Sequence, residues 1–223
     1  MNIALQFAMP AELHALPGAR DLPVVEEDTA VLTIAGQAVD LGAIAKGAAA
    51  DYVVAALTEH GVESAIIALG GNITALGTKP DGSPFRVYVR DPQGEGEDYL
   101  CLMSLPAGWT CSTSGGYERY FEADGQIYHH IIDPATGYPA QSGLLSVTVV
   151  AQDPALADAW STALYVLGAE EALARWESGE GTVAEMDLIL VTEEGHVYIT
   201  EGLEEGLETL GEGAGYTYEI VRR

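Results

Sequence analysis

The stretch LLSVTVVAQDPALADAWSTALYVLG, Leu144 to Gly168, decides the fold class. Its first part, Leu144–Ala151, is apolar and rich in valine, which is typical of a buried strand. Pro154 suits the first turn of a helix and Gly168 suits its end, so we expect a helix over Pro154–Leu167. A strand followed directly by a helix indicates a fold that contains both element types.

The rest of the chain continues this mixture. Two further helices are expected, over Ala43–Leu57 and Ala169–Trp176. Turn dipeptides such as Asp81-Gly82 separate many short β-type runs, which favours antiparallel pairing. These runs are Val31–Ile34, Ala65–Leu69, Phe85–Val89, Tyr99–Met103, Ile127–Ile132, Asp187–Thr192, Val197–Thr200 and Tyr216–Val221. The predicted class is α+β, with mainly antiparallel sheets and packed helices.

The composition excludes several classes of partner. Nine Lys and Arg against 34 Asp and Glu give a formal net charge of −25, which repels nucleic acid and anionic membranes. No run approaches the roughly 20 apolar residues that span a bilayer. The N-terminus lacks the pattern of an export signal, and the compartment stays unknown. Cys101 and Cys111 lack a metal-type spacing, so we expect buried thiols, although a disulfide remains open.

The segment DLGAIAKG, from Asp40 to Gly47, is the first candidate binding site. Asp40 and Gly42 suit a capped turn into a helix, whose N-terminal N–H groups and dipole favour a phosphate. Lys46 lies in the first turns of that helix, where a cation is unfavourable unless an anion compensates it. An exposed lysine that keeps the helix soluble is the alternative interpretation, and the segment alone leaves both open.

Two glycine-containing segments are expected to be turns. Gly70-Gly71 after an apolar run permits a positive φ, and Asn72 could hold the turn through its side chain. The segment Cys111–Tyr120 is interpreted as a hydroxyl-rich turn that leads into an aromatic, charged strand. The G-x-S-x-G frame around Ser114 is absent, which excludes a serine hydrolase of that type.

Two later segments carry further candidate residues. His129 and His130 are adjacent on an expected strand, so they face opposite sides and one of them is structural. An imidazole near a phosphate site could take a proton from a hydroxyl. Asp158 and Thr162 lie four residues apart on one helix face, and their oxygens suit Mg²⁺. Asp158 near a helix N-terminus, with Thr162 bonded to its own helix, is the alternative interpretation.

The order of these segments resembles the ApbE family, the Mg²⁺-dependent FAD:protein FMN transferases. The resemblance covers the chain from about Asp28 to the last strands. The matching blocks are DLGAIAKGAAAD, ALGGNITALG, SPFRVYVRDP, TSGGYERYF, YHHIIDPATGYPA, SVTVVAQDPALADAWSTALYVLG and MDLILVTEEG.

The resemblance implies an ApbE-like, T-fold-related architecture and a specific reaction. FMN is transferred from FAD, the substrate, to a Thr or Ser hydroxyl of an acceptor protein, and AMP is released. His130 would be the catalytic base, and Asp40, Lys46 and the backbone of Ile132 would contact FAD. The metal ligands for Mg²⁺ would be the carbonyl of Ala43 with the side chains of Asp158 and Thr162.

The N-terminal part departs from the family pattern. Family members normally carry a further N-terminal region that helps to hold FAD. We therefore expect residues 1–27 to be an incomplete N-terminal region and residues 28–223 to be the flavin transferase domain. A non-catalytic or vestigial FAD-binding protein, with or without FAD pyrophosphatase activity, is the alternative.

Overall fold

The computed structural model describes residues 24–26, 29–31, 40–95 and 98–223. Strands β1 (Val24–Glu26) and β2 (Thr29–Val31) form a two-stranded antiparallel ladder. The boundary expected between residues 27 and 28 lies outside the described residues, as does most of the strand expected over Val31–Ile34.

A seven-stranded sheet forms the centre of the molecule, in the order β14-β12-β11-β10-β7-β4-β3. Every adjacent pair in it is antiparallel except β12 and β14, which are parallel. Its strands are β3 (Ala65–Leu69), β4 (Asn72–Leu76), β7 (Thr110–Gly115), β10 (Leu144–Ala151), β11 (Asp187–Thr192), β12 (His196–Thr200) and β14 (Thr217–Val221). The expectation of mainly antiparallel sheets is confirmed.

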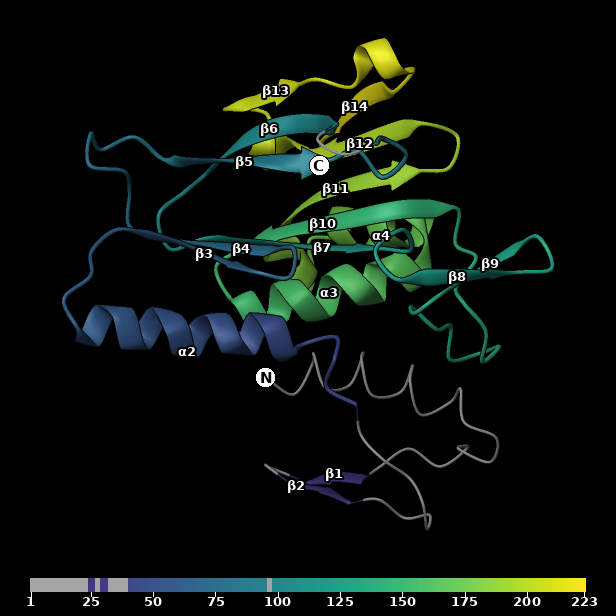
Figure 1. Ribbon diagram of the computed structural model, residues 1–223, viewed down its shortest axis with the longest axis horizontal. Helices are drawn as coiled ribbons and strands as arrows, with labels where there is room; N and C mark the ends of the chain where they lie inside the picture. The colour runs from purple at the N-terminus through teal and green to yellow at the C-terminus, as the bar shows by residue number, and fades with distance from the viewer. Residues whose placement is uncertain (1–23, 27–28, 32–39, 96–97) are drawn as a thin grey trace.

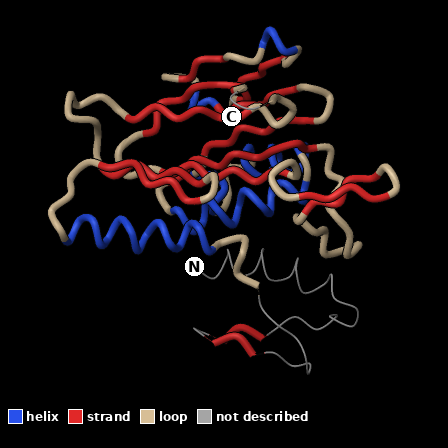
Figure 2. The backbone as a smooth tube through the Cα atoms, viewed as in Figure 1, coloured by secondary structure: helices blue, strands red, loops and turns tan. Residues whose placement is uncertain are grey.

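Helices cover one face of this sheet and a smaller sheet covers the other (Figures 1 and 2). The helices are α2 (Ala45–Glu59), α3 (Pro154–Leu167) and α4 (Ala169–Glu177), with short 3₁₀ turns at Thr182–Glu185, Glu201–Leu203 and Glu212–Ala214. The smaller sheet has the order β13-β6-β5, and its strands are β5 (Phe85–Arg90), β6 (Tyr99–Leu105) and β13 (Leu207–Thr209). Strands β8 (Tyr120–Ala123) and β9 (Gln126–His129) form a separate hairpin.

The two faces of the seven-stranded sheet build two separate cores. Val147 and Val149 of β10 point toward the helices and pack in one cluster with Trp160 and Leu164 of α3. Val150 of the same strand belongs to the cluster between the two sheets. This alternation along β10 is the period of two that a strand buried on both faces requires. No described helix is long and apolar enough to cross a bilayer.

Helix α3 has the bounds that the sequence predicts, because its ends are fixed locally. Asp153 is the N-cap and its carboxylate accepts a hydrogen bond from Leu156 N–H at 2.9 Å, while Pro154 occupies the first turn. Gly168 follows the helix with φ +86°, a conformation that favours glycine. The expected α4 is also confirmed, and α2 begins and ends two residues later than expected.

Three sequence interpretations were wrong in detail. The segment from Cys111 to Gly115 is not a turn but most of β7, a central strand. Gly70 and Gly71 do form a positive-φ turn, but Asn72 starts β4 and its side chain does not hold that turn. The strand expected over Ile127–Ile132 ends at His129, and Ile132 forms only an isolated bridge with Pro139.

The two cysteines are buried and free. Burial raises the pKa of each thiol to about 12, which makes both unreactive at neutral pH. The expectation of buried thiols is confirmed, and the open alternative of a disulfide is excluded.

Candidate functional site

Gly47 brings the first turns of α2 and α3 into direct contact. A Cβ at this position would lie 2.0 Å from the Pro154 carbonyl oxygen, so only glycine fits between the helices. The Gly47 N–H donates to Asp158 Oδ2 at 2.9 Å, across 111 residues of sequence. Gly47 ends the candidate segment DLGAIAKG, but the sequence assigned it no role, although it is the one glycine inside an otherwise alanine-rich helix. This contact fixes where Asp158 lies relative to α2.

Lys46 and Asp158 form the central ion pair of the site. Lys46 Nζ lies 2.8 Å from Asp158 Oδ1, and the side chains are 35% and 1% exposed, respectively. A buried carboxylate needs both a counter-charge and hydrogen bonds. Asp158 obtains the first from Lys46 and the second from Gly47 N–H. The sequence left open whether Lys46 is merely solvated, and the structure shows that it compensates Asp158.

Hydroxyl groups surround the next turn of α3. Ser114 Oγ of β7 lies 2.8 Å from Ser161 Oγ and 3.1 Å from Thr162 Oγ1. Ser161 Oγ–H donates to the Asp158 carbonyl oxygen at 2.8 Å, whereas Thr162 reaches the same oxygen only at 3.5 Å. Thr162 is thus weakly bound to its own helix and lies one turn from the Asp158 carboxylate. Ser114 is a site residue whose position the sequence could not give, because a turn was expected there.

The turn before α2 carries Asp40 and Ala43. Asp40 Oδ1 accepts a hydrogen bond from Gly42 N–H at 2.6 Å, so Asp40 caps this turn, while Ile44 is the N-cap of the helix. Ala43 is buried. Two N–H groups at this helix end are already bonded, Ala45 N–H to a carbonyl in the turn and Gly47 N–H to Asp158. The expected set of free N–H donors is therefore smaller than the sequence suggests.

The two adjacent histidines have different environments. The His129 ring is half-buried; its Nε2–H donates to the Ala140 carbonyl at 3.1 Å and its Nδ1 accepts from Ile131 N–H at 3.3 Å. Burial lowers the pKa of His129. His130 is exposed, and its Nδ1 lies 3.3 Å from the Arg119 carbonyl oxygen, so Nδ1–H is the donor and Nε2 is the acceptor of the neutral ring. The expectation that one histidine is structural agrees with these contacts, which identify it as His129.

The histidine segment is attached to α3 beyond the hydroxyl cluster. The His129 ring packs edge-on against Tyr165, with 5.7 Å between centroids. A Cβ on Gly116, just after β7, would come within 2.8 Å of the His129 ring and of the Tyr165 hydroxyl oxygen. Ile132, half-buried, follows His130 and pairs with Pro139. Asp158, Thr162 and Tyr165 follow one another along α3, and the contact with Tyr165 places His129, the neighbour of His130 in the chain, beyond the hydroxyl cluster.

Comparison with known proteins identifies the family. The ApbE family profile matches residues 7–186. The chain belongs to the ApbE family. The FAD:protein FMN transferase of Treponema pallidum is 46% identical over 156 residues, which cover 66% of this chain and 42% of the relative. The enzyme of that name from Klebsiella pneumoniae is 36% identical over 192 residues, which cover 80% of this chain and 57% of the relative.

Solved ApbE structures share the fold. The ApbE protein of Thermotoga maritima superposes with a TM-score of 0.67 at 31% identity, covering 93% of this chain and 62% of the other. The apo flavinyl transferase ApbE of Pseudomonas stutzeri gives 0.64 at 34% identity, with coverage of 88% and 56%. The α+β class is thereby confirmed. This chain spans about half the length of the ApbE relatives that it matches.

The donor set suits a hard cation. Among the described residues, no three His, Cys, Asp or Glu side chains gather in the way that a transition-metal site requires. The site instead offers one buried carboxylate, Asp158, and the hydroxyl of Thr162 one turn along the same face of α3. Mg²⁺ is commonly bound by one or two carboxylates, with water and substrate phosphate completing its shell. The residues present therefore fit Mg²⁺, with the carbonyl of Ala43 as the third predicted ligand.

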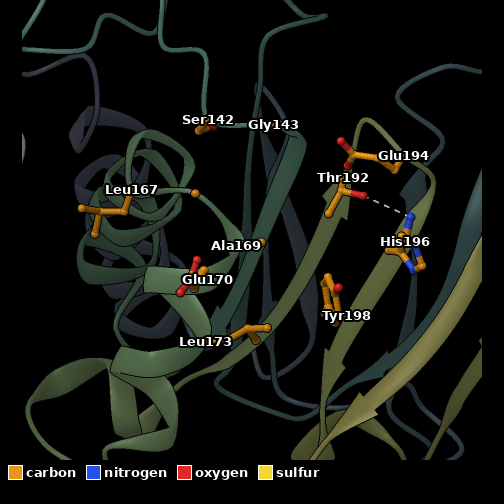
Figure 3. Close-up of a pocket in the computed structure, with 11 residues that line it drawn as sticks. Ser142, Gly143, Leu167, Ala169, Glu170, Leu173, Thr192, Glu194, His196 and Tyr198 are labelled. Atoms are coloured by element: carbon orange, nitrogen blue, oxygen red, sulfur yellow. Dashed lines mark hydrogen bonds between the residues drawn. The ribbon is translucent and has the colours of Figure 1, made fainter.

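A separate pocket of about 510 Å³ lies beyond the C-terminal end of α3 (Figure 3). Leu167 and Glu170 line it from the junction of α3 and α4, while His196 and Tyr198 line it from β12. It contains none of the predicted site residues. The candidate active site of this ApbE protein is the contact between α2, α3 and β7, not this pocket.

Proposed function

We propose that this chain carries the catalytic centre of a Mg²⁺-dependent FAD:protein FMN transferase. Its curated relatives bear that name, and the chain covers part of their length. The observation that carries the proposal is the ion pair of Lys46 with the buried Asp158, because it holds a phosphate-binding cation and a metal-binding carboxylate 2.8 Å apart. Thr162, on the same face of α3, supplies a further oxygen.

The proposed reaction is a phosphoryl transfer in which His130 acts as the base. A Thr or Ser hydroxyl of the acceptor protein attacks the phosphorus on the riboflavin side of the FAD pyrophosphate. The new bond joins that hydroxyl oxygen to phosphorus, the pyrophosphate P–O bond breaks, and AMP leaves. His130 Nε2 takes the hydroxyl proton, since its Nδ1 faces the Arg119 carbonyl.

Binding of FAD rests on the α2 end of the site. Lys46 is 35% exposed, so its ammonium can reach the pyrophosphate while its stem stays between Asp158 and the Gly70 turn, where a Cβ would lie 3.3 Å from Lys46 Cδ. Asp40 and the backbone of Ile132 are the other proposed FAD contacts. Mg²⁺ held by Asp158, Thr162 and the Ala43 carbonyl would neutralise the charge that develops on the phosphates.

The decisive experiment combines the chain with FAD, Mg²⁺ and a threonine-bearing acceptor protein, and measures covalent flavin and AMP together. Asp158→Ala should abolish both while the fold persists. His130→Asn should bind FAD but lower transfer by roughly 10²–10⁴-fold. His129→Asn is the matched control and should lower stability without the same loss per folded molecule.

Each outcome has a distinct meaning. Transfer at the parental rate in His130→Asn would remove His130 from the reaction. Normal FAD turnover in Asp158→Ala would refute the metal site. Release of AMP and free FMN without a labelled acceptor would identify an FAD pyrophosphatase, and FAD binding without turnover would identify a vestigial binder.

A further inference from the structure

The side chains of Asn72 and Ser112 are polar and buried, and they have no hydrogen-bond partner in the described part of the chain. Asn72 is 2% exposed and Ser112 is fully buried. Neither the amide nitrogen nor the amide oxygen of Asn72, nor Ser112 Oγ, has a partner among the described residues. Such groups are rare in folded proteins, and each calls for an explanation.

The two residues lie side by side on the helix-facing side of the sheet. The antiparallel register of β4 and β7 pairs Ile73 with Cys111 and Thr74 with Thr110. Continuing it by one residue sets Asn72 opposite Ser112. Because alternate residues share a face, both point to the same side as Ser114, whose Oγ contacts α3. We call Asn72 and Ser112 the unpaired polar pair.

The neighbours of this pair are fully bonded. On one side, Thr74 Oγ1 and Thr110 Oγ1 lie 2.9 Å apart, and Thr110 also donates to the Ile73 carbonyl at 3.0 Å. On the other side, Ser114 bonds two hydroxyls of α3. On this face of β4 and β7, the unpaired groups thus lie between polar side chains that are all hydrogen-bonded. Poor packing of the whole interface between sheet and helices therefore does not explain them.

The unpaired polar pair is level with Asp158. Strand β7 and helix α3 both run antiparallel to β10 and therefore run in the same direction. Ser114 of β7 contacts Thr162 of α3. Ser112 precedes Ser114 by two residues of strand, and Asp158 precedes Thr162 by one helical turn, which is a similar length. Ser112 therefore lies level with Asp158. The turn before Asn72 lies against Lys46, since a Cβ on Gly70 would be 3.3 Å from Lys46 Cδ. The unpaired polar pair therefore borders the predicted metal site.

The chemistry of the pair selects its ligand. A phosphate oxygen only accepts hydrogen bonds, so it would leave the Asn72 carbonyl oxygen unsatisfied. A water molecule both donates and accepts, and buried water typically makes about three hydrogen bonds to otherwise unsatisfied groups. Mg²⁺ usually keeps several of its waters when a protein binds it.

We propose that Asn72 and Ser112 hold water ligands of the divalent cation at Asp158. The inference rests on the proposed function for the presence of that cation. The pair does not touch the metal; it orients coordinated water and so fixes the geometry of the site. Asn72 and Ser112 are accordingly positioning residues.

The test measures Mn²⁺ binding to the whole chain by electron paramagnetic resonance, together with thermal unfolding in the absence of metal. Asn72→Leu keeps the side-chain size and removes both polar atoms. It should weaken Mn²⁺ binding by roughly 10–100-fold, the usual effect of losing a partner of a metal ligand. Its metal-free melting temperature should stay equal or rise, because an unsatisfied buried amide has been removed. Ser112→Ala should weaken binding in the same direction.

Two further variants sharpen the result. Thr74→Val, at the bonded pair next along the same strands, is the matched control and should leave Mn²⁺ affinity unchanged. Asn72→Asp keeps the acceptor oxygen, replaces the NH₂ donor with a second acceptor oxygen, and should retain or raise affinity. Parental affinity in both Asn72→Leu and Ser112→Ala would overturn the inference but leave the metal site standing. A parent chain that binds no Mn²⁺ would overturn the metal site and the inference together.

Discussion

Replacing Gly47 with alanine tests whether the contact between α2 and α3 builds the site. The added methyl carbon would lie 2.0 Å from the Pro154 carbonyl oxygen, whereas ordinary contact begins at 3.4 Å, so the helices must separate by about 1.4 Å. Helix propensity alone would favour alanine by roughly 1 kcal/mol. Overpacking costs about 1–3 kcal/mol, and the upper end applies here because the atoms that the new Cβ would meet, in Pro154 and Ala155, all belong to the backbone. The net loss of stability is about 2 kcal/mol.

For a chain of this length, that loss lowers the melting temperature by roughly 4–8 °C. Thermal unfolding followed by circular dichroism measures it, and calorimetry with ADP reports the site, which should weaken because Gly47 N–H no longer reaches Asp158. Ala49→Gly, at an exposed position of the same helix, isolates the propensity effect and should cost roughly 1 kcal/mol. A Gly47→Ala protein as stable as the parent would refute the close contact and with it the position of Asp158.

Three other predictions concern Lys46, the cysteines and His129. Lys46→Ala leaves Asp158 without its cation and should cost up to about 3 kcal/mol, the low end for a broken buried pair, because Lys46 is 35% exposed; calorimetry should show weaker ADP binding, and saturating Mg²⁺ should raise the melting temperature more than in the parent. Cys101 and Cys111, each with a pKa raised to about 12 by burial, should resist iodoacetamide at neutral pH until the chain is unfolded, as mass spectrometry would show. Burial lowers the pKa of His129 from 6.5, so the stability it contributes is complete above that value and lost as pH falls through the lowered pKa. His129→Gln should therefore lose less melting temperature than the parent between about pH 7 and pH 5.

Local signals explain which elements the sequence could predict. The bounds of α3 follow from Asp153, Pro154 and Gly168, which act within one turn of the helix ends. Strand β7 was missed because its serines, threonines and glycine have the composition of a turn. The hydroxyls of Thr110, Thr113 and Ser114 bond to partners far away in the sequence, such as Thr148 Oγ1 at 2.8 Å from Thr113 Oγ1, and Ser112 Oγ has no partner among the described residues. Sequence patterns do not show such partners, so the strand could not be recognised.

The residues of the candidate site also separate into those that local sequence patterns could predict and those that depend on tertiary contacts. The spacing of Asp158 and Thr162 placed both on one helix face, which is a local argument. Strand alternation predicted that His129 and His130 differ, but β9 ends at His129, so their different environments come from tertiary contacts. The ion pair of Lys46 and Asp158 depends on Gly47 allowing two helices to touch, which no local pattern encodes. The roles of these residues in transfer stay predictions, and the structure supplies the contacts from which they can be tested.

The ion pair also explains why both a lysine and a divalent cation would bind the carboxylate of Asp158. Lys46 has one ammonium group, which pairs with Asp158 in this structure and would pair with the pyrophosphate in the proposed reaction. Asp158 is 1% exposed, so water cannot compensate its charge when Lys46 turns toward a phosphate. A second positive charge would then have to replace Lys46 at Asp158, and the hydroxyl oxygen of Thr162, one turn along α3, would give a hard cation a further ligand. In the proposed reaction, the burial of Asp158 would therefore couple metal binding to FAD binding, because the bound cation would pair with Asp158 while Lys46 pairs with the pyrophosphate.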